Sequence, residues 1–491
     1  MHSRARLIVE LAVLAAATFA AYATLWTTQN RLWSNGLTPD IPAFLPRPGT
    51  DPAAGLSDSI KAMIFGTLVV ALAAWLFARA ERFAAAGLTW AVIAIPAVLG
   101  IALYLAPPTL SIDAYSYLSH GFLAATPGQN PYVNPSSSVI DTAFGGDLLR
   151  NGWQPVHGVT PYGPLWTGIE RLAYTLSGGN VPVGILLINA PTFAAVIGTA
   201  IVIWRLLGEV APERRLPGVV MFAANPLVLI ELVGEGHNDA VMVFFVVLAI
   251  YAAIRRSAFA AVLAISAAAL VKASALPIGL LVLVALIVWR RSWLRLAGEL
   301  GAALLVAVAG TGALFAPYWV GMPTLDGLLA ADLPSAGWSV SGVLATALDP
   351  HTAQGILTAL LVLSTAACCF LIRSVPGFLR ACGIVSLVIL LLLPLEWPWY
   401  AALPSALLAL AAEELDAVVI LLMALGSRLV APIGDASSVG AMQWTLFTTM
   451  QALVGQTVPA AIGLWATVTR VRERRRERGE DGAARGALGV G

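Results

Sequence analysis

The sequence predicts an all-α polytopic membrane protein. Of its 491 residues 59% are hydrophobic and only 11% are charged, whereas a soluble domain carries about a quarter charged residues. The mean hydropathy is +0.83. Apolar runs of about 20 residues recur along the chain, and each is long enough to cross the hydrocarbon core of a bilayer as a helix. The net charge of +1 gives no preference for nucleic acid, so we expect no nucleic-acid partner.

The apolar runs give about 14 candidate spans, and we expect a bundle of roughly 12–14 transmembrane helices. The first run has a basic flank and small residues near "AAYA", as a signal peptide has, but its length favours an uncleaved helix. The candidate spans are residues 7–27, 60–79, 84–106, 182–206, 216–233, 239–254, 257–271, 274–290, 296–318, 352–372, 380–395, about 400–413, 416–433 and 442–469.

Arginines near the ends of these spans predict the orientation, because cytoplasmic loops are enriched in basic residues. With both termini in the cytoplasm, almost every arginine cluster falls on the cytoplasmic side. Only Arg428 fits badly, so region 400–434 is the weak part of the predicted topology. The clusters are Arg4 and Arg6, Arg79 and Arg82, Arg214 and Arg215, Arg255 and Arg256, Arg290, Arg291 and Arg295, Arg373 and Arg380, and the tail "TRVRERRRERGED".

The segments on the external side include the longest polar stretch of the chain, residues 107–181. This stretch is rich in Pro, Gly, Asn, Tyr and Trp rather than in the residues of disordered linkers. Long loops with their own packing residues are usually functional. We expect short helices at 113–125 and 164–176 that lie on the membrane surface. The other external segments are 28–59, 234–238, 319–351 and 396–400.

Four external clusters and one lysine carry the polar and aromatic residues that suggest chemistry. Each residue has an ordinary structural explanation: Asp113 or Asp239 can cap a helix, tryptophans favour membrane interfaces, and Lys272 can extend its amine to the interface. The clusters are "SIDAYSYLSHG" with "PGQNPYVNP" (Asp113, Tyr115, Tyr117, His120, Tyr132), "GVTPYGPLW" (Tyr162, Trp166), "NPLVLIELVGEGHNDA" (His237, Asn238, Asp239) and "LEWPWY" (Trp397, Trp399), and the lysine is Lys272 in "ALVKASALP".

The joint pattern favours a functional site. Acids, imidazoles, an amine and aromatic rings gather on one predicted membrane face, where ionisable groups are candidates for function. The chain has no H-E-x-x-H zinc motif, no P-loop and no G-x-S-x-G turn. An aromatic pocket that holds an acid suits sugar chemistry, because a carboxylate can take the proton of a hydroxyl group.

Four of these motifs resemble a known family. "SIDAYSYLSHGFLAATPGQNPY", "TPYGPLW", "NPLVLIELVGEGHNDAVM" and "EWPWY" look like segments of the polyprenol-phosphate-mannose-dependent mannosyltransferases that build actinobacterial lipomannan and lipoarabinomannan. These enzymes have the GT-C fold of membrane glycosyltransferases. The resemblance extends from about residue 84 to about residue 410, in the same order and on the same predicted side.

The resemblance implies an inverting transfer of mannose from polyprenyl-phosphate-mannose to a hydroxyl of a glycan or glycolipid, which forms an α-mannosidic linkage, expected to be α-1,6. Asp113 would be the general base, and Lys272 and His237 would neutralise the leaving phosphate. It implies no divalent cation. The bilayer, the lipid-linked donor and the acceptor would be the partners, at the external face of a bacterial plasma membrane. The implied donor- and substrate-binding residues are Tyr115, Tyr117, His120, Tyr132, Tyr162, Trp166, Asn238, Asp239, Lys272, Trp397 and Trp399.

One departure from the family pattern affects the domain prediction. GT-C enzymes usually carry the catalytic acid in the first external loop, whereas Asp113 lies in the second, so we interpret the first two helices as an N-terminal addition. Asp40, Asp51 and Asp58 in the first loop are alternative bases by position. The predicted regions are an N-terminal helix pair (1–83), a GT-C catalytic core (84–410), C-terminal transmembrane helices (411–469) and a basic cytoplasmic tail (470–491).

Other classes of membrane protein could carry parts of this pattern. A transferase for another polyprenyl-phosphate sugar, arabinose or glucose, would share these motifs. A secondary transporter or lipid flippase would place ionisable groups near the bilayer midplane on broken helices, often with inverted repeats. A membrane scaffold would not require Asp113, His237 and Asp239 to face one cavity.

Overall fold

All regular secondary structure in the described part of the chain is helical. The computed structural model describes residues 2–33, 52–154, 158–330, 339–393, 397–411, 413–438, 446, 449–467 and 469–470. In these residues seven helices are long and apolar enough to cross a membrane. The predicted class, an all-α polytopic membrane protein, is therefore confirmed. The long helices are α1 (His2–Trp33), α2 (Pro52–Ala85), α7 (Val181–Val210), α12 (Trp293–Phe315), α15 (Pro350–Cys369), α16 (Val375–Leu392) and α18 (Glu414–Ser438).

Four shorter apolar helices complete the central part of the bundle, and all four coincide with predicted spans. They are α3 (Thr89–Leu105), α9 (Asp239–Ile254), α10 (Ala258–Ala269) and α11 (Leu276–Val288). A helix of 12 residues such as α10 rises only about 18 Å, which is less than the thickness of the hydrocarbon core. The predicted number of spans, roughly 12–14, stays a prediction.

The predicted span 216–233 is divided into two helices. α8 (Arg215–Ala223) and the π-helix η3 (Val228–Gly234) are bent by 57° relative to each other. The break falls at Asn225 and Pro226, because proline disfavours helical backbone at the preceding residue and donates no N–H. The Asn225 side chain accepts a hydrogen bond from the Leu227 N–H at 3.0 Å and so stabilises the turn. The apolar pattern alone did not indicate this break.

The two short helices predicted in the long polar segment are confirmed as helices. α4 (Asp113–Ala125) and α6 (Pro164–Ser177) match the predictions 113–125 and 164–176 closely. Pro164 begins α6 and Gly178, with φ of 60°, ends it, as expected from helix-terminus preferences. The two helices pack against each other so closely that a Cβ on Gly121 would lie 2.2 Å from the Glu170 carbonyl oxygen.

The other elements are short helices and connections. They are η1 (Ser136–Val139), α5 (Ala143–Arg150), η2 (Pro212–Arg214), η4 (Ala273–Ala275), η5 (Ala316–Tyr318), α13 (Pro323–Ala330), α14 (Val340–Ala347), η6 (Pro398–Ala401), α17 (Ala402–Ala409), η7 (Gln451–Thr457) and a helix over 458–467. Part of the predicted span 442–469 and nearly all of the predicted tail 470–491 lie outside the described residues.

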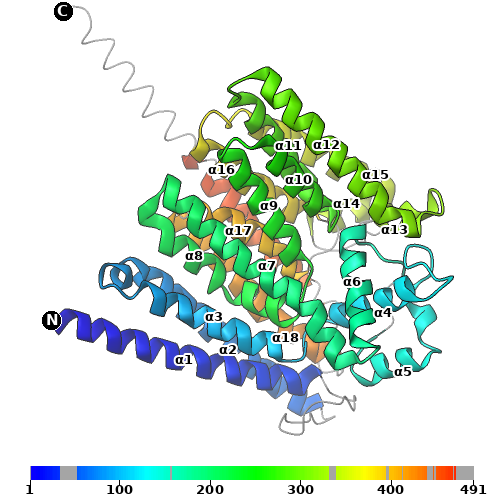
Figure 1. Ribbon diagram of the computed structural model, residues 1–491. Helices are drawn as coiled ribbons and strands as arrows, with labels where there is room; N and C mark the ends of the chain where they lie inside the picture. The colour runs from blue at the N-terminus through cyan, green and yellow to red at the C-terminus, as the bar shows by residue number, and fades with distance from the viewer. Residues whose placement is uncertain are drawn as a thin grey trace, which may run out of the picture.

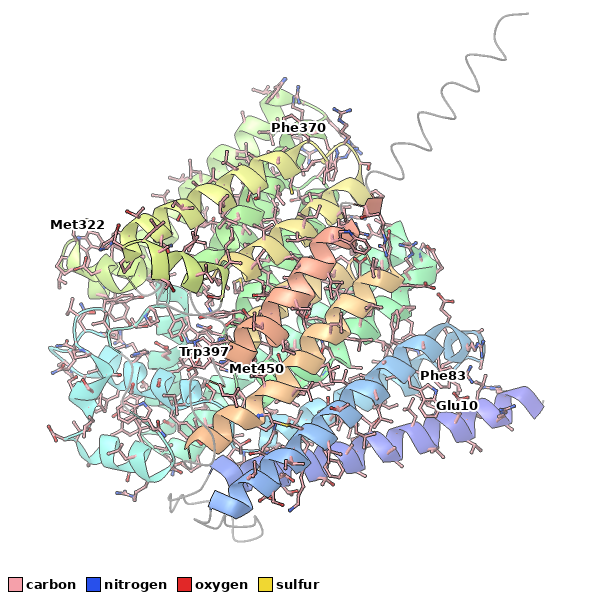
Figure 2. All side chains as sticks on the ribbon, turned by 180° about the vertical axis from the view of Figure 1, so that it is seen from behind. Glu10, Phe83, Met322, Phe370, Trp397 and Met450 are labelled. Carbon is pink, nitrogen blue, oxygen red and sulfur yellow. The ribbon has the colours of Figure 1, made fainter. Side chains whose placement is uncertain are left out.

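The α4–α6 region lies at the end of the bundle that is opposite to the N-terminus (Figure 1). Seen from behind, Trp397 lies on the side of this region, whereas Glu10 and Phe83 lie toward the opposite end (Figure 2). α2 packs against α1 and α18. The first helix pair is thus joined to the C-terminal helices in space, although the two are far apart in sequence.

Several arginines of the predicted cytoplasmic loops come together. Arg380 contacts Asp416 at 2.7 Å and Glu413 at 2.8 Å, and Arg214 and Arg470 also approach Glu413. Arg428 differs, because it is fully buried on α18 and forms an ion pair with Glu231 on η3. Its poor fit to the predicted topology has a physical reason: it lies inside the bundle rather than in a loop.

Candidate active site

Segments from all four predicted clusters meet at the end of the bundle where α4 begins. The loop before α4 binds the residues that follow η3, those residues stack against η6, and the segment with Lys272 lies against both α9 and η6. Such convergence is what distinguishes a site from scattered interfacial residues.

A row of charged groups forms the centre of the candidate site. Asp113 is the first residue of α4, and its Oδ2 atom lies 3.3 Å from His237 Nδ1. The other ring nitrogen of His237, Nε2, lies 3.6 Å from Glu231 Oε2. Glu231 in turn pairs with Arg428. All four side chains are almost completely buried, so each charge depends on its neighbour for stabilisation.

The two carboxylates control the charge of His237. Burial acts to lower the pKa of the imidazole, but Asp113 and Glu231 outweigh burial and raise it to about 9. A positively charged imidazolium between two carboxylates is therefore the favoured state at neutral pH. Because its two ring nitrogens face different carboxylates, His237 is an ion-pair partner of both Asp113 and Glu231.

Aromatic stacking holds the His237 ring in place. The ring lies on Trp399 with centroids 3.7 Å apart and an interplanar angle of 19°. Trp399 in turn stacks on Trp397, with centroids 5.3 Å apart and the rings parallel within 1°. An imidazolium over an indole face also gains a cation–π attraction. The two predicted tryptophans thus support the acid–imidazole row from one side.

Lys272 is the partly accessible cation of the site. Its Nζ atom lies 3.1 and 3.0 Å from the two carboxylate oxygens of Asp239, and 4.2 Å from the centre of the Tyr400 ring. The Lys272 side chain is 19% exposed, whereas that of Asp239 is 4% exposed. The ammonium group can therefore meet an anion from outside while Asp239 holds it from within.

Two tyrosines line the other side of Asp113. The Tyr117 hydroxyl donates to Asp113 Oδ2 at 3.5 Å, and the Tyr117 ring packs edge-on against Tyr162 and Trp166. The turn at Tyr162 is bound to the Lys272 segment, because the Gly163 N–H donates to the Val271 carbonyl at 3.1 Å. A Cβ on Gly163 would lie 2.1 Å from the Leu270 oxygen, so only glycine fits there.

The remaining predicted residues lie around this centre. Tyr132 is buried, and its hydroxyl bonds to the Tyr162 carbonyl and the Thr167 hydroxyl, both at 3.1 Å. His120 is buried with its Nδ1 atom 3.5 Å from Glu170. The other three, Tyr115, Trp166 and Asn238, are also buried. Their burial suits side chains that pack around the charged row, and the binding roles of these residues stay predictions.

Four ionisable residues of this region were not singled out from the sequence: Glu170, Glu231, Glu235 and Arg428. Burial raises the pKa of Glu170, which faces His120. Glu231 and Glu235 stand within the quoted third cluster, and an acid in an apolar run is itself a signal of function. For Arg428 the signal was its misfit to the predicted topology.

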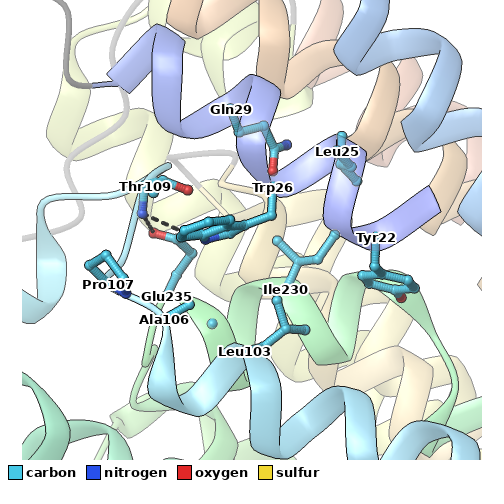
Figure 3. Close-up of a pocket in the computed structure, with 11 residues that line it drawn as sticks. Tyr22, Leu25, Trp26, Gln29, Leu103, Ala106, Pro107, Thr109, Ile230 and Glu235 are labelled. Carbon is cyan, nitrogen blue, oxygen red and sulfur yellow. Dashed lines mark hydrogen bonds between the residues drawn. The ribbon is translucent and has the colours of Figure 1, made fainter. Parts of the chain in front are cut away.

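Glu235 fixes the loop that leads to Asp113. Its carboxylate accepts hydrogen bonds from three successive backbone N–H groups, those of Thr109, Leu110 and Ser111, at 2.9–3.1 Å. Trp26 from α1 lies beside the carboxylate (Figure 3). Burial raises the pKa of Glu235 to about 7, although the loop N–H groups act in the opposite direction. α1 thus contributes to the surroundings of the loop that precedes Asp113.

We expect Glu235→Gln to lower the kcat of the mannose transfer that the resemblance implies roughly tenfold, since a neutral amide accepts backbone hydrogen bonds less strongly than a carboxylate. Glu235 becomes ionised as the pH rises through about 7. Wild-type activity should therefore rise over that range, and this rise should disappear in the variant. Both effects are measured from initial transfer rates between about pH 5.5 and 8, at pH values roughly one unit apart on either side of the pKa.

Glu299→Gln is the matched control for this variant. Glu299 also accepts backbone hydrogen bonds, from Ala258 at 2.7 Å and Phe259 at 3.3 Å, but it lies on α12, away from the loop before α4. It should keep the wild-type pH profile. An unchanged profile in Glu235→Gln would contradict the positioning role of Glu235.

Two further expectations concern metals and alternative bases. Among the described residues no group of three or more His, Cys, Asp or Glu side chains is arranged to hold a metal ion. Independence from divalent cations stays a prediction. Of the alternative bases, Asp40 and Asp51 lie outside the described residues, and Asp58 contacts Lys61 at 2.9 Å.

Together the fold and the site define a multi-pass helical membrane protein in which carboxylates, an imidazole, an amine and aromatic rings meet at one end of the bundle. A family model for the N-terminal domain of alpha-(1→6)-mannopyranosyltransferases matches residues 32–291, more than half of the chain. The protein belongs to this family, and the resemblance read from its motifs is confirmed.

Two curated relatives agree with this assignment. Alpha-(1→6)-mannopyranosyltransferase A of Corynebacterium glutamicum is 29% identical over 182 residues, which are 36% of this chain and 34% of the relative. The protein of the same name from Mycobacterium tuberculosis is 27% identical over 353 residues, which are 64% of each chain. The matches thus span less than two thirds of either relative.

Proposed function

We propose that this protein transfers mannose, with inversion, from polyprenyl-phosphate-mannose to a hydroxyl of a glycan or glycolipid and forms an α-1,6 linkage. The observation that carries the proposal is the row Asp113–His237–Glu231 beside Lys272, in a chain of the alpha-(1→6)-mannopyranosyltransferase family. This row supplies a carboxylate for a hydroxyl proton and a cation for a leaving anion, which are the two groups that the reaction needs.

In the proposed reaction the acceptor oxygen attacks C1 of the mannose from the face opposite the phosphate. The acceptor O–H proton passes to Asp113, the bond between C1 and the acceptor oxygen forms, and the bond between C1 and the phosphate oxygen breaks. The lipid phosphate leaves with the bonding electron pair. His237 holds Asp113 in place, and the Lys272 ammonium stabilises the charge that develops on the phosphate.

An apolar groove supports a lipid-linked donor. The groove, with an empty volume of about 790 Å³, lies between α3 and α7 and is lined by residues such as Pro96, Gly100 and Phe193. Leu229 and Val233 of η3 also line it, while Glu231 on the same helix contacts His237. We assign the groove to the prenyl tail, because one side of η3 then faces the tail and another belongs to the reactive centre.

The orientation of the chain in the membrane decides on which face the site lies. The site lies at the end opposite the N-terminus, and the arginine-rich loops favour a cytoplasmic N-terminus. We therefore assign the reaction to the external face of the plasma membrane, where the bilayer, the donor and the acceptor are the partners.

The test is transfer by the purified protein in liposomes. Labelled polyprenyl-phosphate-mannose and an α-1,6-linked mannose oligosaccharide should give a product that is longer by one α-linked mannose, as identified by NMR. Polyprenyl-phosphate arabinose and glucose are the comparison donors. If the protein prefers the arabinose or the glucose donor, that sugar and not mannose is the one it transfers. Uptake or flipping of the lipid without any transfer would overturn the proposal.

We expect Lys272→Met to lower kcat by about 10²–10³-fold, since removing one group that stabilises transition-state charge has an effect of that size. Lys272→Arg should retain most of the activity. Lys272→Met leaves the Asp239 carboxylate without its cation, which could destabilise the protein. The double variant Lys272→Met with Asp239→Asn removes both charges, so a loss of activity in it reflects catalysis rather than an unpaired carboxylate. A soluble, well-folded double variant with wild-type kcat would exclude Lys272 as the phosphate partner.

A further inference from the structure

A second charged pocket lies away from the candidate active site. It has an empty volume of about 580 Å³ and lies between the α9–α10 and α11–α12 connections. Five arginines line it: Arg255, Arg256, Arg290, Arg291 and Arg295. We call it the arginine pocket. No part of the proposed transfer reaction uses these residues.

The charges in this pocket are not balanced. Arg255 contacts Glu209 at 3.3 Å, and Arg295 contacts Glu299 at 2.8 Å. Five arginines and two glutamates leave three positive charges. Among the described residues no carboxylate lies within ion-pair distance of Arg256 or Arg291. A concave surface with this excess charge attracts a multivalent anion such as a phosphate group, which arginine binds in a bidentate manner.

The backbone at Arg256 has a left-handed conformation that is unusual for a residue with a side chain. Its φ is 60°, and it is the one non-glycine residue with positive φ in the described part of the chain. It follows α9 at a position where helices usually place glycine, because a side chain there is strained. The fold thus accepts a strained backbone at a residue whose side chain lines the arginine pocket.

The surroundings of the pocket are those of a bilayer interface. Leu286, Trp289 and Leu296 form apolar parts of its wall. Next to it Trp293 is 59% exposed and Leu294 is 86% exposed. α9 begins at Asp239 in the active site and ends at Ile254 beside the pocket, a rise of about 24 Å. The arginine pocket and the active site thus lie near opposite surfaces of the membrane.

We propose that the arginine pocket binds the phosphate headgroup of an anionic phospholipid in the leaflet opposite the candidate active site. The arginines hold the phosphate, while the apolar wall and the exposed Trp293 and Leu294 contact the acyl chains. Basic pockets between membrane helices suit such headgroups. A free phosphate ion would contact the arginines, but it has no apolar part that could pack against the apolar surface.

Native mass spectrometry of the delipidated, full-length protein tests this proposal. Phosphatidylglycerol is titrated against the protein, with phosphatidylcholine and inorganic phosphate as comparison ligands. We expect saturable binding of phosphatidylglycerol at a site that neither comparison ligand fills. In the double variant Arg256→Gln with Arg291→Gln, binding should weaken roughly 30-fold. Arg256→Lys with Arg291→Lys should restore most of it.

Arg82→Gln with Arg373→Gln is the matched control. Both residues are exposed arginines of predicted cytoplasmic loops outside the pocket, and the variant has the same net charge as the test variant. It should bind phosphatidylglycerol like the wild type. Equal weakening in both variants would show diffuse attraction and overturn the assignment. Equal competition by inorganic phosphate would overturn the lipid as ligand. Gel filtration and transfer activity confirm that the variants fold.

Discussion

Asp113→Asn is expected to lower mannose transfer by about 10²–10⁴-fold, the range for removal of a general base. The asparagine side chain has nearly the same size and can still accept the hydrogen bond that Tyr117 donates to this position. His237 keeps Glu231 as its second partner. The site should therefore keep its shape and lose only the group that takes the acceptor proton. Initial rates at saturating donor measure the effect on kcat.

Donor binding and a second carboxylate serve as the controls for this variant. Affinity for the lipid-linked donor should be unchanged, because no step of binding requires the proton acceptor. Asp58→Asn removes an acid that contacts Lys61 outside the candidate site, and it should leave the rate unchanged. If Asp113→Asn retains more than about a tenth of the activity, the base is another group, and Asp239 is the next to test.

Much of the fold and of the site could be predicted from the sequence. The long apolar runs predict the spanning helices, and the pattern at 113–125 and 164–176 predicts α4 and α6. Arginine placement predicts which ends of the helices share a side, and the clusters that it assigns to one side do meet in the structure. Residues such as Asp113, His237 and Trp399 are indeed neighbours in the structure.

What could not be predicted depends on contacts between distant parts of the chain. Glu235 binds backbone N–H groups that precede it by 124–126 residues. Glu231 meets Arg428 across 197 residues. Hydrophobic periodicity carries no information about such pairs. It also does not indicate that Pro226 divides one apolar run into α8 and η3, and that division brings Glu231 to the site.

Arg428→Met is expected to destabilise the protein by about 3–5 kcal/mol, which is typical when one partner of a buried ion pair is removed. Methionine fills the space of the arginine but leaves two buried carboxylates, those of Asp113 and Glu231, with His237 as their one cation in the row. Gly66 packs against the Arg428 backbone and Cβ, so the α2–α18 contact should remain. The thermal transition of the detergent-solubilised protein, followed by fluorescence-detected gel filtration, should move to lower temperature.

The double variant Glu231→Gln with Arg428→Met distinguishes loss of the pair from loss of packing. It removes both charges and should recover a large part of the lost stability, because no uncompensated charge stays buried. Recovery would be incomplete, since Glu231 also faces His237 at 3.6 Å. If the double variant is no more stable than Arg428→Met, the arginine acts through its packing and other contacts. The charge of Glu231 then has its main partner in His237, and the row at the candidate site ends there.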